Sequence, residues 1–142
     1  MAGLVATAET DIDAPPQRVW QAMTDPALIA QYMFGSEVVT DWQPGSSIVW
    51  QGEYEGKPYQ DKGEILEVEP EQRLAVTHFS PLSGQDDVPE NYHRIDYVLT
   101  GSGGRTHLAL SQDGNGSEEE AGHAAETWQT MLDGLKKVAE SS

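Results

Sequence analysis

Two histidines, His78 and His93, lie in stretches where apolar and polar residues alternate, and each is in phase with apolar neighbours. A period of two is typical of β-strands, so both imidazoles are predicted to face the apolar side. An imidazole in a dry pocket can hydrogen-bond a ligand carbonyl or act as a general acid or base. The alternative is a histidine satisfied within the core, or standing in water at a strand end. His107 and His123 are predicted to be exposed.

Aromatic and apolar side chains share the predicted inner side of the strands and recur at helical spacing near the C-terminus. Apolar walls with a few polar groups are what small-molecule sites require, so these residues are candidates for lining a pocket. They are Trp50, Tyr54, His78, His93, Ile95, Tyr97, Leu108 and Leu110 from strands, and Trp128, Met131, Leu132 and Leu135 from a helix. All except Ile95 and Leu110 are predicted ligand-binding residues. The alternative is that they fill the core, and a bulge in any strand would reverse the side of the residues beyond it.

Motifs for metal, phosphate or covalent chemistry are missing from the sequence or fail on inspection. The stretch 113–117 begins like a calcium loop, but Glu118 and Ala124 stand where that loop requires glycine and glutamate. The glycine-rich stretch 101–104 lacks the lysine and the helix start of a phosphate loop. There are no cysteines, which excludes disulfides, thiol catalysis and thiolate metal sites. We therefore assign no catalytic residue, no metal and no cofactor.

The charge balance is strongly acidic, with 24 acidic and 8 basic residues among 142, for a formal net charge of −16. Such a field repels nucleic acid and anionic membranes. It indicates a solvated acidic surface or, alternatively, a basic protein or cationic ligand as partner. The sequence lacks a run of about 18 apolar residues, so no insertion into a membrane is expected. The start of the chain does not resemble a signal peptide, which with the absence of cysteine favours a cytoplasmic protein.

Strands and helices must position these side chains, and the sequence predicts both. Pro15-Pro16 suits a first helical turn, and Asp25 before Pro26 is a candidate N-cap of a second short helix. Ser117 and Glu120 match a capping box, and an apolar stripe with helical period follows. Strands are predicted over 3–12, 36–42, 47–54, 59–68, 73–79, 92–100 and 105–111, helices over 16–23, 26–33 and 117–139, and turns or loops over 80–91, 101–104 and 113–116.

Antiparallel strands joined by short turns, with helices at the two ends of the chain, predict an α+β fold. We expect a curved antiparallel sheet of about six or seven strands, two short helices near the N-terminus and one long C-terminal helix. That helix is predicted to cover the apolar face of the sheet. Residues 1–142 have the usual size of a single domain. A sheet that grips one long helix in this way usually encloses a pocket.

Four stretches of the sequence resemble the helix-grip superfamily: 14–26, 63–74, 105–110 and the helix face over 128–135. That superfamily includes START domains, the birch-pollen-allergen fold and polyketide cyclases. Within it, the chain most resembles the family related to the C-terminal domain of the activator of heat-shock protein 90 ATPase. The resemblance implies a helix-grip fold whose cavity lies between the concave face of the sheet and the terminal helix.

Two residues differ from those usual in that family: His78 and Tyr32 both stand at positions where tryptophan is frequent. The chain also has no room for the separate N-terminal domain of the eukaryotic co-chaperone. The resemblance and the aromatic inner face predict binding of a small hydrophobic or aromatic ligand, such as a lipid or polyketide. One alternative is a protein-interaction module acting as a co-chaperone of heat-shock protein 90. Another is a cyclase- or hydratase-like enzyme that uses His78 or His93.

Overall fold

The structure is a computed structural model, and it describes residues 4–33, 35–54, 56–80 and 86–141. Within these residues, seven strands form one antiparallel sheet in the order β1-β7-β6-β5-β4-β3-β2. The elements are β1 (Leu4–Ile12), α1 (Pro16–Thr24), α2 (Pro26–Tyr32), β2 (Glu37–Val39), β3 (Ser47–Tyr54), β4 (Lys57–Glu69), β5 (Arg73–His78), β6 (His93–Ser102), β7 (Arg105–Asn115) and α3 (Glu118–Glu140). A short 3₁₀ helix covers Pro89–Asn91.

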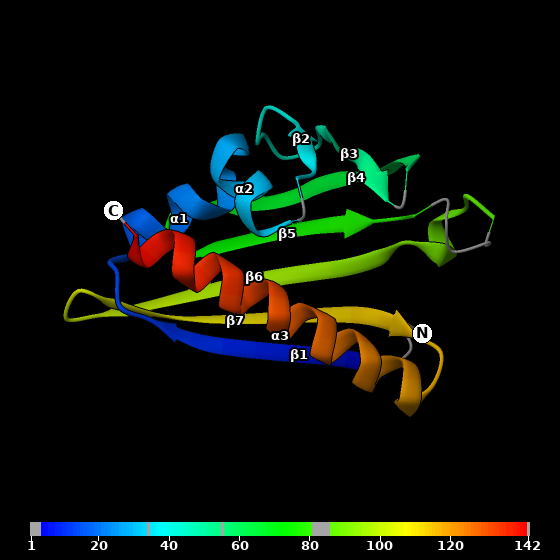
Figure 1. Ribbon diagram of the computed structural model, residues 1–142. Helices are drawn as coiled ribbons and strands as arrows, with labels where there is room; N and C mark the ends of the chain where they lie inside the picture. The colour runs from blue at the N-terminus through cyan, green and yellow to red at the C-terminus, as the bar shows by residue number, and fades with distance from the viewer. Residues whose placement is uncertain (1–3, 34, 55, 81–85, 142) are drawn as a thin grey trace.

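Figure 1 shows α3 lying along one face of the curved sheet, with α1 and α2 on the same side near the end of α3. The helices are in mutual contact, and α3 packs chiefly against β1. The predicted α+β arrangement, with two short helices followed by strands and one long terminal helix, is therefore confirmed.

The starts of α2 and α3 use the capping residues that the sequence predicts. The Asp25 carboxylate accepts a hydrogen bond of 2.9 Å from the Ala27 amide. At α3, the Ser117 hydroxyl accepts from the Glu120 amide at 3.1 Å, and the Glu120 carboxylate accepts from the Gly116 amide at 2.9 Å. The returning bond thus goes one residue earlier than in a strict capping box. Both caps satisfy amides that have no partner inside the helix.

The core lies between the concave face of the sheet and the helices. Fully buried side chains come from every layer: Ile12, Ile48, Ile65, Ile95 and Leu108 from strands, Val19 from α1, and Leu132 and Leu135 from α3. Each such side chain contributes about 1.5–3 kcal/mol on removal from water. This burial holds α3 against the sheet and determines the distance between them, and so the size of any cavity that remains between the two.

Several boundaries differ from the sequence-based expectation. The stretch 113–116 was expected to be a turn, but β7 runs to Asn115, which pairs with Leu4 of β1. A bulge makes this extension possible, because Gly114 takes a positive φ of 78° that absorbs the extra residue. β4 begins at Lys57 rather than 59, and β6 runs to Ser102, into the stretch 101–104 that was predicted to be a turn. The strand predicted over 36–42 is limited to Glu37–Val39.

The middle of β4 approaches β5 closely. A Cβ atom at Gly63 would collide with the carbonyl oxygen of Thr77. Two residues later the register shifts between Ile65 and Glu67, which marks a bulge. The bulge changes the alternation, so Ile65 and Val68 both pack toward the core although they are three residues apart.

Candidate functional site

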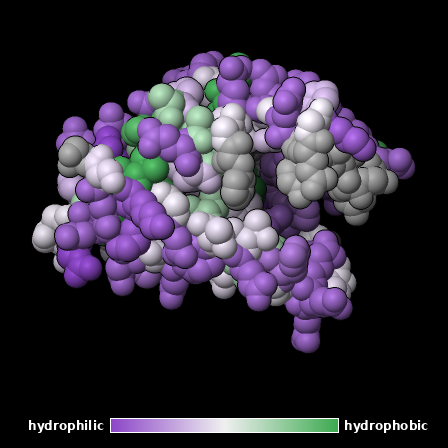
Figure 2. All heavy atoms as spheres, in the orientation of Figure 1, coloured by the Kyte–Doolittle hydropathy of each residue, from purple (hydrophilic) through white to green (hydrophobic). Residues whose placement is uncertain are grey.

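A cavity of about 550 Å³ lies between the sheet and α3. Its walls come from β3, β4, β5 and β6 on one side and from α3 on the other, with Met33 and Ser36 from the segment after α2. The lining residues are Met33, Ser36, Trp50, Glu53, Tyr59, Asp61, His78, Ser80, Ile95, Tyr97, Thr127, Trp128 and Met131. Figure 2 shows that the face above it is largely hydrophilic and is hollowed near its centre. The arrangement is that of a pocket with an apolar interior and a polar rim.

The structure divides the predicted site residues into two groups. Trp50, His78, Tyr97, Trp128 and Met131 line the cavity, together with Ile95. Leu108, Leu110, Leu132 and Leu135 are buried in the core instead, each no more than 2% exposed. The side chain of Tyr54 lies outside the described part of the structure.

His93 also lies outside the cavity wall, although it pairs directly with His78 across β5 and β6. Its Nδ1 is 2.7 Å from the carbonyl oxygen of Asp113, and its ring rests against Gly114. The bulge of β7 therefore holds this imidazole. His123 is exposed, as predicted.

The apolar part of the cavity is built from aromatic rings held by specific contacts. The rings of Trp50 and His78 meet in an edge-to-face arrangement, with centroids 5.1 Å apart and an interplanar angle of 62°. The indole N–H of Trp128 donates to the side-chain oxygen of Gln112 in β7, which anchors the ring to the sheet. Such contacts pre-orient the rings, and pre-orientation reduces the entropy lost when a ligand binds.

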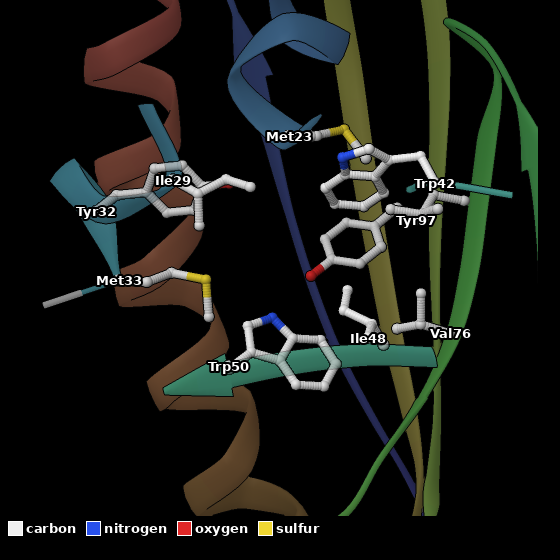
Figure 3. A pocket seen from close by; sticks show the side chains of 10 residues that line it. Met23, Ile29, Tyr32, Met33, Trp42, Ile48, Trp50, Val76 and Tyr97 are labelled. Carbon is white, nitrogen blue, oxygen red and sulfur yellow. The ribbon is translucent and has the colours of Figure 1, made fainter. Parts of the chain in front are cut away.

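A second, smaller hollow of about 30 Å³ lies deeper, beneath α2. Figure 3 shows the Tyr97 hydroxyl pointing toward the space between Met33 and Trp50, which line both hollows. Burial raises the pKa of Tyr97 above its ordinary value, so this phenol stays protonated at neutral pH. Burial likewise raises the pKa of Tyr32, whose hydroxyl donates to the Ala22 carbonyl at 2.9 Å.

The polar part of the cavity centres on Asp61 and His78. The imidazole Nε2 of His78 lies 2.9 Å from Asp61 Oδ2. The side chain of His78 is 24% exposed and that of Asp61 is 18% exposed. Nearby, the hydroxyls of Tyr59 and Ser36 form a short hydrogen bond. A carboxylate that orients an imidazole is an arrangement compatible with proton transfer, and equally with binding a polar ligand group.

Sequence reasoning missed Tyr59 and Asp61, although a signal was present. Both lie an even number of residues before the apolar Ile65 on the same strand. Extending the alternation backwards therefore places them on the side of Ile65, which is fully buried. Tyr59 also lies directly opposite Gly52, and the missing side chain of Gly52 leaves room for the phenol ring. The contributions of Met33 and Thr127 carried no comparable signal, because they depend on how α2 and α3 dock.

The described residues contain no group of three or more histidine, aspartate or glutamate side chains arranged to hold a metal ion. None of the helices in that part of the chain is long and apolar enough to cross a membrane.

An antiparallel sheet wrapped around a long C-terminal helix, with a cavity between them, defines the helix-grip class. The chain belongs to the family described as "Activator of Hsp90 ATPase homolog 1-like protein", whose profile matches residues 13–140. A comparison with curated proteins gave no match.

Solved structures share this fold over nearly the whole chain. ChR145 from Cytophaga hutchinsonii is 46% identical with a TM-score of 0.86, and the match covers 99% of this chain and 96% of that one. CalU16 from Micromonospora echinospora is 26% identical with a TM-score of 0.72, over 94% and 74%. MLL2253 from Mesorhizobium loti is 22% identical with a TM-score of 0.79, over 98% of both chains, a likeness of fold alone.

Proposed function

We propose that this protein binds a small, largely apolar or aromatic molecule, without covalent chemistry, in the cavity between the sheet and α3. The observation that carries the proposal is the cavity itself, about 550 Å³ in volume and walled by Trp50, Tyr97, Trp128 and Met131. Small-molecule sites typically measure about 300–1,000 Å³ and combine apolar walls with a few polar groups. A cytoplasmic location and a single functional domain over residues 1–142 are parts of the same proposal.

The indole N–H signals of the tryptophans test this proposal by NMR, during titration with a lipid, a polyketide and a flavonoid. Trp50 and Trp128 line the cavity, and we expect their signals to shift and saturate with at least one compound. Trp20 on α1 packs against the core away from the cavity and is the internal control. If neither cavity signal moves with any of the three classes, or all tryptophans shift without saturation, the proposal is wrong.

A second candidate function is catalysis of a cyclase or hydratase type, favoured by the Asp61–His78 pair. In this mechanism the carboxylate orients the imidazole, which moves a proton to or from a bound substrate. It requires that His78→Ala abolish turnover while the variant still folds and binds. Retention of turnover in a folded His78→Ala protein would exclude it.

Family membership favours a third candidate, a protein-interaction role as a co-chaperone. The cognate heat-shock protein 90 should then show a higher ATPase rate when this protein is added. Trp128→Ala, inside the cavity, should leave that stimulation intact, because a protein partner would contact the outer surface. An unchanged ATPase rate with the native protein would remove this candidate.

A further inference from the structure

The ionisable side chains that line the described part of the cavity are two carboxylates and one histidine, so its only permanent charges are negative. Glu53 and Asp61 are among its lining residues, His78 is the one basic side chain, and the described lining contains neither lysine nor arginine. The nearest lysine in sequence, Lys62, points to the other side of β4 and forms an ion pair with Asp87. Within the described residues, no permanent cation therefore compensates the carboxylate of Asp61 from inside the cavity.

Hydrogen bonding at this wall is incomplete. Asp61 Oδ2 is paired with His78 Nε2 at 2.9 Å, but Asp61 Oδ1 and His78 Nδ1 are shielded from solvent and have no partner among the described residues. When Nε2 of a neutral imidazole carries the proton and donates to Asp61, Nδ1 is an acceptor as well. The pair then holds two unsatisfied acceptors, and buried acceptors without donors are unfavourable.

The rest of the wall suits a positive charge. The rings of Trp50, Tyr97 and Trp128 line the same cavity. A cation close to the face of an aromatic ring is attracted by the negative potential of that face, most strongly for tryptophan. A carboxylate or phosphate in the same place would meet Asp61 and Glu53, and the described lining residues include no lysine or arginine to offset the repulsion.

We propose that the ligand is an amphipathic amine, with an apolar or aromatic body in the cavity and a protonated amino group beside Asp61. This inference rests on the proposed function and adds the charge of the ligand to it. It separates the ligand from fatty acids and from phospholipids with a net negative headgroup.

Three probes with one aromatic body test the charge: naphthylmethylamine, naphthylmethanol and naphthoate. Titrations followed by calorimetry at about 0.15 M salt limit the long-range field of the protein to a Debye length of about 8 Å. We expect the amine to bind roughly tenfold more tightly than the alcohol, as for a hydrogen bond to a charged group, and naphthoate to bind more weakly than either.

Asp61→Asn keeps the shape of the side chain and removes the charge, so it should weaken the amine roughly tenfold and leave the alcohol unchanged. Glu64→Gln removes the same charge from the exposed side of β4 and is the matched control, expected to change neither affinity. If Asp61→Asn does not fold, Glu53→Gln at the same cavity provides a second test, with a smaller loss for the amine.

The outcomes separate the two proposals. Binding of all three probes with equal affinity, or tighter binding of naphthoate, overturns the amine inference and leaves the proposed function standing. An equal loss for amine and alcohol in Asp61→Asn also overturns it, because Asp61 would then act only on the shape of the cavity. If none of the three probes binds the native protein, the proposed function fails for aromatic ligands and the inference fails with it.

Discussion

At the residue scale, the ionisable groups differ according to where they lie. Inside the fold, burial raises the pKa of both Tyr97 and Tyr32, so both phenols are neutral, and the Tyr32 hydroxyl donates to the Ala22 carbonyl. On the surface, pairing with an opposite charge changes the pKa of His107 more than burial does. His107 of β7 faces two carboxylates of β1, with Asp11 Oδ1 2.9 Å from Nδ1 and Glu9 Oε2 3.3 Å from Nε2. This cluster links the edge strand to its neighbour through charge as well as through the backbone.

We expect the His107 imidazole to titrate with a pKa above the ordinary value of 6.5, because its hydrogen bond to Asp11 favours the protonated form. The pairing therefore stabilises the fold fully below the unfolded-state pKa, and this contribution disappears as pH rises through the folded-state pKa. At an exposed site it amounts to less than about 1 kcal/mol. NMR titration of the native protein and of Asp11→Asn measures the shift, and a native pKa at or below that of the variant would contradict it.

At the scale of elements, a close approach between the neighbouring strands β4 and β5 shapes the sheet. Lys62 exchanges backbone hydrogen bonds with Phe79 of 3.0 and 2.7 Å, and the Glu64 amide donates to the Thr77 hydroxyl at 2.9 Å. Between them, Gly63 lies against the Thr77 backbone with no space for a side chain. This close approach brings Asp61 next to His78, so the polar wall of the cavity depends on it.

Gly63→Ala should lower the free energy of unfolding by at least about 2 kcal/mol, because the added methyl group has to displace backbone rather than a flexible side chain. Gly122→Ala on α3 is the matched substitution, since a Cβ there meets nothing within 4 Å. In a helix interior it should stabilise by about 0.5–1 kcal/mol. Urea unfolding measures both; equal effects of the two variants would refute the close approach.

The end of α3 is tied to α1 by one side chain. Arg18 donates from Nε to the Ala139 carbonyl at 3.2 Å and from a terminal nitrogen to the Val138 carbonyl at 3.1 Å. Both carbonyls lie in the last turn of α3, where the usual amide four residues on is missing, although the Val138 carbonyl also accepts from the Ser141 amide at 3.3 Å. A cation is also favourable at that end of the helix dipole.

Arg18→Ala should therefore destabilise the protein by about 1–2 kcal/mol and speed hydrogen exchange in the last turn of α3. The exposed Arg105 provides the control, and Arg105→Ala should change stability by less than about 0.5 kcal/mol. Unchanged exchange rates at the end of α3 in Arg18→Ala would show that these hydrogen bonds do not hold the helix end.

At the scale of the whole molecule, a net charge of −16 on 142 residues produces self-repulsion that opposes the compact state. Its ion pairs are mostly exposed, such as Arg94 with Glu67, and they offset only part of that repulsion. The same field disfavours anionic partners, in agreement with the sign of the charges around the cavity.

We expect sodium chloride to stabilise the protein as its concentration rises from about 0.01 M to about 1 M, because the Debye length falls from about 30 Å to about 3 Å. The measurement is the urea midpoint at neutral pH across that range. Potassium chloride should give the same curve, which separates screening from binding of a specific ion. A midpoint that falls with salt would mean that attractive ion pairs outweigh the net repulsion.

The sequence by itself determined the elements and their order. Local signals sufficed for this: Asp25 and Ser117 cap the helices they were predicted to cap, and the alternation through Ile48, Leu74 and Ile95 places strands with the correct inner side. The stretch resembling a calcium loop is accounted for by the end of β7 and the α3 cap. These features depend on neighbours within a few residues, so a linear pattern contains them.

Only the tertiary structure decided which inward residues face open space and which fill the core. Leu132 and Met131 are adjacent on α3, yet one is sealed in the core and the other borders the cavity. Asp61 lies beside His78 because β4 approaches β5 closely at Gly63. His93 lies outside the cavity, with its ring against the bulge of β7. The period of apolar residues in a sequence shows which side of a strand or helix faces the core. The shape of a cavity depends instead on the distances between strands and helices, which are set by packing across the whole sheet.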